Sequence, residues 1–296
     1  KTPNILAADY GAIQARALAW IANDPSMLAA YGNPKESLYL KMGDKIFGRR
    51  IDKKAEPLEY VLCKALVLGC GFGMSGAKFR AICMLRESRK FMLMLDNAGI
   101  DLADSVKLYR KTYPRVVALW SELQKVVIDA VNGTQGHAGR CDFFVVNNNL
   151  HCILPSGRPT IYRNARLEMR VPGYCKMYNM PEIPVPTVIY DDPRGHEGFL
   201  YGGKMTENIC MGIERDLLAD AIIKSEQMNL MPFLHVHDEL VCASEESKLS
   251  LMCEIMSVGP EWAKTLPILV EGYSGPQLTK NLQGYRQLNM LSGVKI

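Results

Sequence analysis

Three carboxylates in this sequence lie where apolar segments end. Asp9 follows the apolar residues 5–8, and Asp238 and Glu239 interrupt the largely apolar segment 232–242. If the two segments pair as strands, Asp9 and Asp238 converge. They could then bridge two divalent ions about 4 Å apart, which would hold the attacking and leaving oxygens of a phosphoryl transfer. Oxygen ligands favour Mg²⁺ over zinc. The alternative is that these are acidic turn residues without a common role.

Two histidines beside these carboxylates allow a different interpretation. His235 and His237 alternate on the expected strand, so their side chains point to the same face and could bind zinc or iron. That arrangement would indicate a metal hydrolase. His137, His151 and His196 lie in scattered polar loops and not in a comparable context.

Four side chains spaced by four residues define one face of an expected helix: Tyr60, Lys64, Leu68 and Phe72. Lys64 could neutralise a triphosphate, while Leu68 and Phe72 could pack on a base or sugar. The alternative is an ordinary amphipathic helix on which the Lys64 ammonium extends into solvent. The glycines that follow Leu68 do not form a phosphate-binding P-loop, because no GlyLysSer or GlyLysThr closes them.

The composition of the 296-residue chain excludes several classes of protein. Hydrophobic residues make up 48% and charged residues 22%, as in an average globular protein. The apolar runs fall short of the ~18 residues that span a membrane. No signal peptide is recognisable, and the start at Lys1 hints at a piece of a longer protein. The nine cysteines include no CxxC pair, so we expect reduced thiols in a cytosolic compartment.

Positive charge is clustered along the chain. Residues 35–54, 78–90 and 158–176 each carry four more basic than acidic side chains, although the whole chain has a net charge of +4. Clustered positive charge on an otherwise acidic chain indicates a polyanionic partner such as nucleic acid. Basic side chains that only solvate the surface would give the same pattern.

The expected elements place these residues at strand ends and along helices. We expect strands over residues 4–9 and on both sides of the turn in 232–242, and a β-hairpin over 143–162 around the turn 155–158. The many Pro and Gly residues of 171–203 indicate a loop or insertion. Helices are expected over residues 14–22, 35–47, 57–68, 102–131 with a break at Pro114, and 207–228.

Three motifs follow one another along the chain. They are DYGAIQAR at residues 9–16, Lys64 followed by FGMS at 72–75, and HDE at 237–239. Asp9 and Lys64 are 55 residues apart, and Lys64 and Asp238 are 174 apart. With these motifs the chain resembles the family A DNA polymerases, the group of bacterial DNA polymerase I and many phage replicative enzymes.

Intervening stretches are similar to the phage-type branch of that family. They are residues 109–114 with Trp120, 154–158, 201–204 with 207–208 and 215–218, and 260–271. The resemblance covers almost the whole chain.

The resemblance implies an α+β right-hand polymerase fold, with an antiparallel palm sheet and largely helical fingers. It assigns residues 1–32 to the palm with the metal-binding strand, 33–150 to the fingers with a phage-type insertion, and 151–296 to the palm with the HisAspGlu hairpin. In this family the thumb, and any 3′–5′ exonuclease, precede the first motif. Only eight residues precede Asp9 here, so we expect the thumb to be absent from this chain and an upstream polypeptide to supply it.

The resemblance also implies roles for individual residues. Asp9, Asp238 and the Tyr10 carbonyl would bind two Mg²⁺ ions, with Glu239 as a supporting catalytic carboxylate. The incoming nucleotide would contact Tyr10, Gln14, Tyr39, Tyr60, Lys64, Leu68 and Phe72. Primer–template DNA would contact Lys204, Asn208, Met211, Arg215 and His237, and Arg166 and Arg170 are further candidates for phosphate contacts.

Several positions depart from the family pattern. Tyr60 replaces an Arg, which removes one triphosphate contact. Gln14 replaces a Glu that excludes the ribose 2′-hydroxyl, and Phe72 replaces the Tyr that partners this Glu. Because Gln is nearly isosteric with Glu, the steric block should survive, but the Tyr–Glu hydrogen bond cannot form and sugar discrimination can loosen. Met211 replaces a Gln near the minor groove, and Leu68 replaces an aromatic residue.

We therefore expect a template-directed DNA polymerase that adds dNMP from dNTP to a primer 3′-hydroxyl, for phage genome replication in the host cytoplasm, without a membrane partner. The alternative is a degenerate polymerase-fold subunit that binds nucleic acid or a partner without catalysis. The substitutions motivate this alternative. The presence of both metal carboxylates, His237 and Lys64 argues against it.

Overall fold

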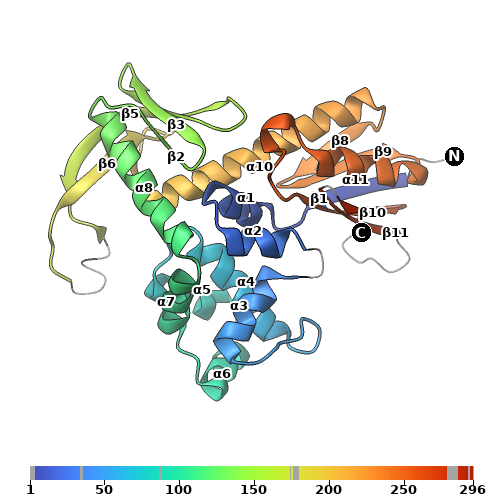
Figure 1. The fold of residues 1–296 in the computed structure, drawn as a ribbon, viewed down its shortest axis with the longest axis horizontal. Coiled ribbons are helices and arrows are strands. Elements are labelled where there is room, and N and C mark those ends of the chain that lie inside the picture. Colours follow the sequence, from blue (N-terminus) through green and yellow to red (C-terminus); the bar gives the residue numbers. More distant parts are fainter. Residues whose placement is uncertain are drawn as a thin grey trace.

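The computed structural model describes residues 4–33, 36–86, 89–173, 175, 180–278, 286–292 and 294–295. Two antiparallel six-stranded sheets lie at opposite ends of the long helix α10 (Gly202–Gln227), and a group of helices lies beside them (Figure 1). The expected α+β class, with antiparallel sheets and a largely helical region, is confirmed.

The first sheet carries the predicted carboxylates. Its strand order is β12-β11-β10-β1-β9-β8, so β1 (Asn4–Tyr10) lies between β9 (Glu239–Ser244) and β10 (Leu269–Gly275). The core residues of β1 are completely buried, which agrees with its continuous apolar run. The predicted pairing of the first strand with the HisAspGlu segment is confirmed. The remaining strands are β8 (Pro232–Val236), β11 (Arg286–Leu291) and β12 (Val294–Lys295).

Helices with clear start signals match their predictions. Pro57 is the first residue of α4 (Pro57–Cys70), and Pro114 separates α7 (Leu102–Thr112) from α8 (Pro114–Val131). Residue 35 of the helix predicted over 35–47 lies outside the described residues. The other helices of this region are α1 (Ile13–Ile21), α2 (Pro25–Tyr31), α3 (Leu38–Phe47), α5 (Gly76–Arg86) and α6 (Arg89–Ala98).

The second sheet is a meander in which β2 to β7 pair in chain order. The predicted hairpin is confirmed as β4 and β5, with Gly157 at φ +84° in the turn between them. A loop or insertion was expected over 171–203. The loop was wrong for residues 185–191 and 197–200, because these residues form β6 and β7. In β6, Val188 and Ile189 are completely buried. The free energy gained by burying these β-branched side chains outweighs the low strand propensity of the neighbouring prolines. The strands are β2 (Gly136–Ala138), β3 (Cys141–Val146), β4 (Asn149–Ile153), β5 (Pro159–Arg170), β6 (Val185–Asp191) and β7 (Glu197–Leu200).

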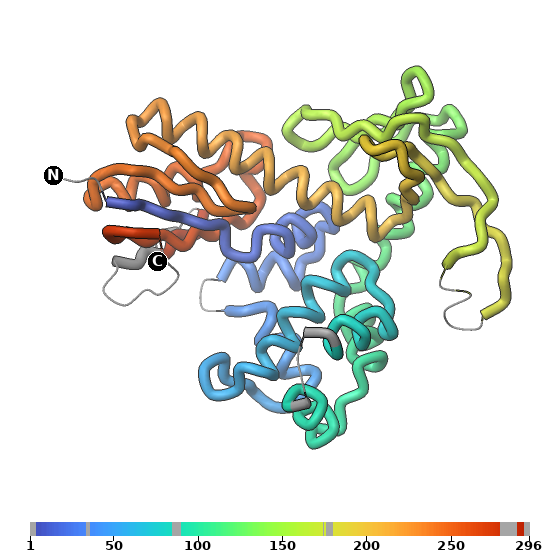
Figure 2. The backbone as a smooth tube through the Cα atoms, turned by 180° about the vertical axis from the view of Figure 1, so that it is seen from behind, coloured from blue at the N-terminus to red at the C-terminus, as the bar shows by residue number. Residues whose placement is uncertain are grey.

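Helix α10 connects the two sheets, as the view from behind also shows (Figure 2). It begins five residues before the predicted start at Glu207, because its two initial glycines are packing positions and not loop residues. A Cβ on Gly202 would lie 1.9 Å from the Trp120 carbonyl oxygen, and one on Gly203 would lie 2.4 Å from the Phe72 carbonyl oxygen. The backbone at the start of α10 therefore packs directly against the backbone of α8 and of the segment that follows α4.

The C-terminal part adds α11 (Leu249–Val258) with two single-turn helices, η1 (Glu246–Lys248) and η2 (Glu261–Ala263). Helix α11 packs on β10 and β11 of the first sheet. All nine cysteines are buried, and no disulfide joins them. Within the described ranges, no helix has both the length and the apolar character that a membrane span requires.

Candidate active site

Three carboxylates stand in register across neighbouring strands of the first sheet. Asp9 on β1 lies directly opposite Glu239 on β9 and, on its other side, directly opposite Glu271 on β10. Residues directly opposite in an antiparallel pair share one face of the sheet, and like charges in that position repel. This row of carboxylates, which we call the acidic row, is therefore a place where a bound cation would relieve repulsion.

A tight turn brings Asp238 to the same place. Strands β8 and β9 are joined by the two residues His237 and Asp238, and His237 has a positive φ of 54°, as two-residue hairpin loops require. The Tyr10 N–H donates a hydrogen bond of 3.2 Å to the Asp238 carbonyl oxygen. The backbones at Asp9 and Asp238 thus lie side by side, as the sequence predicted.

Tyr10 faces the opposite side of the sheet from Asp9. Its buried ring extends toward α10, where the hydroxyl donates to the Leu217 carbonyl oxygen at 3.3 Å. Burial, and then the charge of Asp220, raise the pKa of Tyr10 well above its ordinary value, so the hydroxyl remains protonated. The predicted contacts of Tyr10 with metal and nucleotide therefore fall to its backbone carbonyl.

Glu239 is held by a tyrosine that the sequence analysis did not identify. The Tyr273 hydroxyl donates a short hydrogen bond to the Glu239 carboxylate. The pKa of Tyr273 is raised by burial, by that hydrogen bond, and by the negative charges of Glu239 and Asp9. Tyr273 lies two residues after Glu271 on β10, within a strand that the sequence pattern left unassigned.

A further carboxylate, also missed from sequence, lies on α10. Glu214 is only 9% exposed, and the Gln14 side-chain amide donates to it at 2.8 Å. Burial raises the pKa of Glu214 most, and the hydrogen bond from Gln14 lowers it. The negative charge of Asp238 raises this pKa further, whereas His237 lowers it. The available signal was the spacing of Glu214, which lies four residues after Cys210 and three before Leu217, on the apolar side of the helix.

The outer face of α4 is arranged as its spacing predicted. Lys64 is exposed, and Leu68 and Phe72 are half-buried, whereas the opposite face of the helix is in the core. In the described part of the chain, Lys64 makes no ion pair. The stripe therefore presents one positive charge beside two apolar groups.

Tyr60 connects this helix to the acidic row. Its ring packs edge-to-face on Tyr39, with centroids 6.0 Å apart, and the Lys53 ammonium lies 5.1 Å from its centroid. Burial raises the pKa of Tyr60 most, followed by the charge of Glu271. Tyr39 is itself mostly buried, which raises its pKa to about 12 and leaves it little surface for a nucleotide.

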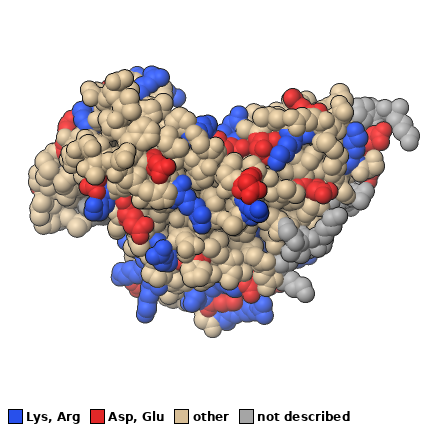
Figure 3. All heavy atoms as spheres, turned by 45° about the horizontal axis from the view of Figure 1, so that its top comes forward, with Lys and Arg blue, Asp and Glu red and all other residues tan. Residues whose placement is uncertain are grey.

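The predicted DNA contacts of α10 share one face of the helix. Lys204, Asn208, Met211 and Arg215 are exposed or half-exposed, at helical spacing. The Asn208 amide donates to the Tyr162 hydroxyl at 2.9 Å, and Lys204 pairs with Glu207 at 2.9 Å. Between the two sheets, over the middle of α10, the surface is hollowed, and basic and acidic side chains mix around this hollow (Figure 3).

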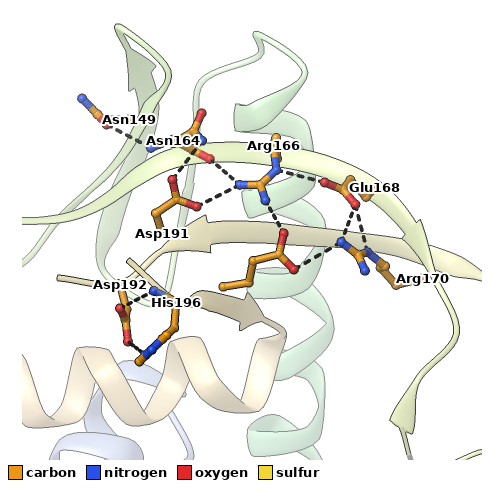
Figure 4. A network of polar contacts seen from close by, with 9 residues as sticks. Asn149, Asn164, Arg166, Glu168, Arg170, Asp191, Asp192 and His196 are labelled. Atoms are coloured by element: carbon orange, nitrogen blue, oxygen red, sulfur yellow. Dashed lines mark hydrogen bonds and ion pairs between the residues drawn. The ribbon is translucent and has the colours of Figure 1, made fainter. Parts of the chain in front are cut away.

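Two further phosphate-contact candidates are engaged elsewhere. Arg166 pairs with Glu168, Asp191 and Glu197, and Arg170 pairs with Glu168 and Glu197 (Figure 4). This network ties β5, β6 and β7 together on an exposed surface. The two guanidinium charges are therefore balanced within the second sheet.

The donor set of the site suits magnesium better than zinc. No cluster of three or more His, Cys, Asp or Glu side chains in the described residues is arranged to hold a metal alone. The interpretation of His235 and His237 as zinc or iron ligands thus finds no third ligand there. Mg²⁺ commonly uses one or two carboxylates and completes its shell with water and substrate phosphates, which fits Asp9 and Asp238.

Comparison with known proteins identifies the type of fold. No protein-family model matches the chain. The DNA polymerase of Bacillus phage SP02 is 26% identical over 273 residues, which cover 90% of this chain and 39% of that protein. A solved structure, the POL domain of Pol1 from M. smegmatis in complex with DNA primer-template and dNTP, matches with a TM-score of 0.53 at 15% identity, over 93% of this chain and 40% of the other. The chain thus spans about two fifths of the length of these proteins. In sequence and fold, it resembles the fingers and palm portion of a family A DNA polymerase.

Proposed function

We propose that this chain is the catalytic portion of a template-directed DNA polymerase, which adds dNMP to a primer 3′-hydroxyl. The observation that carries the proposal is the convergence of Asp9 and Asp238 beside the acidic row. The similarity to a phage DNA polymerase supports the same activity and a role in phage genome replication in the host cytoplasm.

In this proposal, Asp9, Asp238 and the Tyr10 carbonyl hold two Mg²⁺ ions. When bound, the ions supply positive charge that acidifies the 3′-hydroxyl and stabilises the pyrophosphate leaving group. Glu239 supports the site from β9, and its hydrogen bond from Tyr273 fixes the carboxylate orientation.

The nucleotide site extends from the acidic row to α4. Lys64 neutralises the triphosphate, and Leu68 and Phe72 pack on the base and sugar. The remaining nucleotide contacts come from the Tyr10 backbone, Gln14 and Tyr60. Tyr39, predicted as a further contact, is mostly buried and supports the Tyr60 ring from behind. Glu214 fixes the amide of Gln14, because a carboxylate can only accept the N–H of that amide and so leaves the Gln14 carbonyl oxygen directed elsewhere.

Primer–template DNA lies against the exposed face of α10 and the β8–β9 turn. Lys204, Asn208, Met211 and Arg215 contact the duplex, and His237 contacts the primer end. We assign residues 1–32 and 151–296 to the palm and 33–150 to the fingers, although the boundary at 150 falls within β4 of the second sheet. Because the matched proteins are longer, we propose that an upstream polypeptide supplies the thumb and any exonuclease.

A degenerate, non-catalytic polymerase fold is the second candidate. The observations that favour it are the substitutions at Tyr60, Gln14, Phe72 and Met211, which remove polar contacts to nucleotide and DNA. Such a protein would bind primer–template without Mg²⁺-dependent extension.

Primer extension separates the two candidates. The chain, together with its upstream polypeptide, is incubated with primed DNA template, dNTPs and Mg²⁺. We expect extension by the natural protein, none by Asp238→Asn, and undiminished extension by Glu122→Gln, an exposed carboxylate of α8. DNA binding without extension by the natural protein would favour the degenerate subunit.

A further inference from the structure

The segment between α3 and α4 carries a cluster of positive charge close to the exposed stripe of α4. Its basic residues are Arg49, Arg50, Lys53 and Lys54. The Arg49 guanidinium is paired with the Glu56 carboxylate, and this contact lowers the pKa of that carboxyl. Lys53, in contrast, makes no ion pair within the described ranges, and its side chain is exposed. The proposed function so far gives Lys53 no role.

Contacts on both sides hold the backbone of Lys53 in place. Ile51 is only 4% exposed, and it packs so closely on Gly43 of α3 that a Cβ there would lie 2.5 Å from the Ile51 side chain. The Asp52 carboxylate then accepts the N–H groups of the two residues that follow Lys53, each at 2.8 Å, and so closes a turn around it. The exposed side chain of Lys53 therefore starts from an anchored backbone.

The Lys53 ammonium lies over the ring of Tyr60, at the N-terminal end of the α4 stripe. It is 5.1 Å from the ring centroid, within the range of a cation–π contact. The same ring packs edge-to-face on Tyr39, with centroids 6.0 Å apart. Because residues four apart lie one above the other on a helix, Tyr60 is the neighbour of Lys64 along the stripe. Lys53 thus adds a second positive charge beside that of Lys64.

The two charges follow the direction in which a nucleoside triphosphate would lie. In the proposed site, the base and sugar pack on Leu68 and Phe72, toward the C-terminal end of α4, so the phosphates extend toward its N-terminal part. Burial and then the charge of Glu271 raise the pKa of Tyr60, so this end of the stripe is within electrostatic reach of the acidic row. A lysine ammonium is a compact charge with three donors, which suits the oxygens of a phosphate.

We propose that Lys53 binds the terminal phosphate of the incoming nucleotide, and that the Tyr60 ring holds its ammonium in place for this contact. Lys64, one turn further along the helix, then binds the phosphates closer to the sugar. The inference rests on the proposed function for the identity of the ligand, a deoxynucleoside triphosphate. It adds to that function a second cation, which comes from the segment before α4 and not from the helix itself.

The experiment measures nucleotide binding without catalysis. The chain, together with its upstream polypeptide, is bound to a template whose primer ends in a dideoxynucleotide. Isothermal titration calorimetry in Mg²⁺ then gives the dissociation constants of the next correct nucleotide, once as dNTP and once as dNDP. Because Lys53 is exposed, its hydrogen bond to a charged phosphate falls at the weaker end of such bonds, so we expect Lys53→Ala to weaken dNTP binding about tenfold. Binding of dNDP, which lacks the terminal phosphate, should change by less than about twofold.

Two further variants locate the effect. Lys54→Ala removes an adjacent exposed charge of the same segment and should leave both dissociation constants unchanged. Tyr60→Leu removes the ring that holds Lys53, so in this background Lys53→Ala should weaken dNTP binding only about threefold or less. Equal losses in Lys53→Ala and Lys54→Ala, equal losses for dNTP and dNDP, or fully additive effects of Lys53→Ala and Tyr60→Leu would overturn the inference.

Parallel primer extension separates this inference from the proposed function. Binding of dNTP that depends selectively on Lys53, without any extension by the natural protein, would retain the phosphate contact and reject the polymerase activity. Extension by the natural protein, with no selective loss of dNTP affinity in Lys53→Ala, would retain the activity and reject the contact.

Discussion

The Gln14 side-chain amide donates a 2.8 Å hydrogen bond to the Glu214 carboxylate, although the two residues are 200 positions apart in the chain. Gln14 belongs to α1, the helix that follows the strand carrying Asp9. Glu214 belongs to the buried side of α10. The contact joins the first motif to the helix proposed to bind DNA. It also places a fifth acidic group, besides Asp9, Asp238, Glu239 and Glu271, in the candidate active site.

Glu214 should make stability depend on pH. Burial raises its folded pKa above the ordinary value of about 4.3. The folded state then binds the proton more tightly than the unfolded state, so this group stabilises fully below the ordinary pKa and less as pH rises toward the folded pKa. Glu214→Gln stays neutral and can still accept the Gln14 N–H. We therefore expect the free energy of unfolding of the variant, relative to the natural protein, to rise as the pH increases above the ordinary pKa of about 4.3.

Urea denaturation in EDTA at several pH values measures this difference. Glu226→Gln, an exposed position on the same helix, is the matched control and should show no such trend. A pH-independent difference between Glu214→Gln and the natural protein would contradict the assignment.

The acidic row should be sensitive to cations. Like charges directly opposite on neighbouring strands cost about 0.2–1 kcal/mol, so Glu271→Gln should raise the melting temperature of the metal-free protein by about 1–4 °C. Mg²⁺ should raise the melting temperature of the natural protein, and Asp9→Asn should reduce that increase. Differential scanning fluorimetry in EDTA and in Mg²⁺ tests both statements, and an equal Mg²⁺ response of the natural protein and Asp9→Asn would refute the second.

Lys64 should act on nucleotide affinity. A hydrogen bond to a charged group is worth about 1.5–3 kcal/mol, so Lys64→Ala should lower kcat/KM for dNTP about 10- to 100-fold. Lys78→Ala, an exposed lysine of α5, should leave kcat/KM unchanged. Steady-state primer extension provides the comparison, and equal losses in both variants would indicate a general effect of charge.

The first residue of α10 should tolerate no side chain. A Cβ on Gly202 would lie 1.9 Å from the Trp120 carbonyl oxygen, and backbone cannot rotate away as a side chain can. We expect Gly202→Ala to lower the free energy of unfolding by about 1–3 kcal/mol. Gly133→Ala is no suitable control because of its positive φ, but Gly173→Ala, where a Cβ would meet no atom of the described residues within 4 Å, should change it by less than about 0.5 kcal/mol. Urea denaturation followed by circular dichroism distinguishes the two.

Local patterns in the sequence were enough to predict many of the elements. Pro57 and Pro114 mark helix starts because proline fits the first helical position. The apolar run before Asp9 predicted a buried strand, and the polar residues 237–239 between apolar segments predicted two strands joined by a turn. The structure narrows that turn to His237 and Asp238. From these elements alone, Asp9 and Asp238 could be expected to converge.

The sequence by itself therefore determined the strand and turn that carry Asp9 and Asp238, and the exposed stripe of α4 that carries Lys64. Only the tertiary structure decided that Glu271 lies opposite Asp9, that Glu214 receives the Gln14 amide, and that Gly202 packs on Trp120. The physical reason is the range of the interactions. Turns, helix starts and apolar periodicity depend on neighbouring residues. The register of β1 with β10 and the backbone contact of α10 with α8 depend on how segments far apart in the sequence pack. Local sequence patterns do not predict this packing.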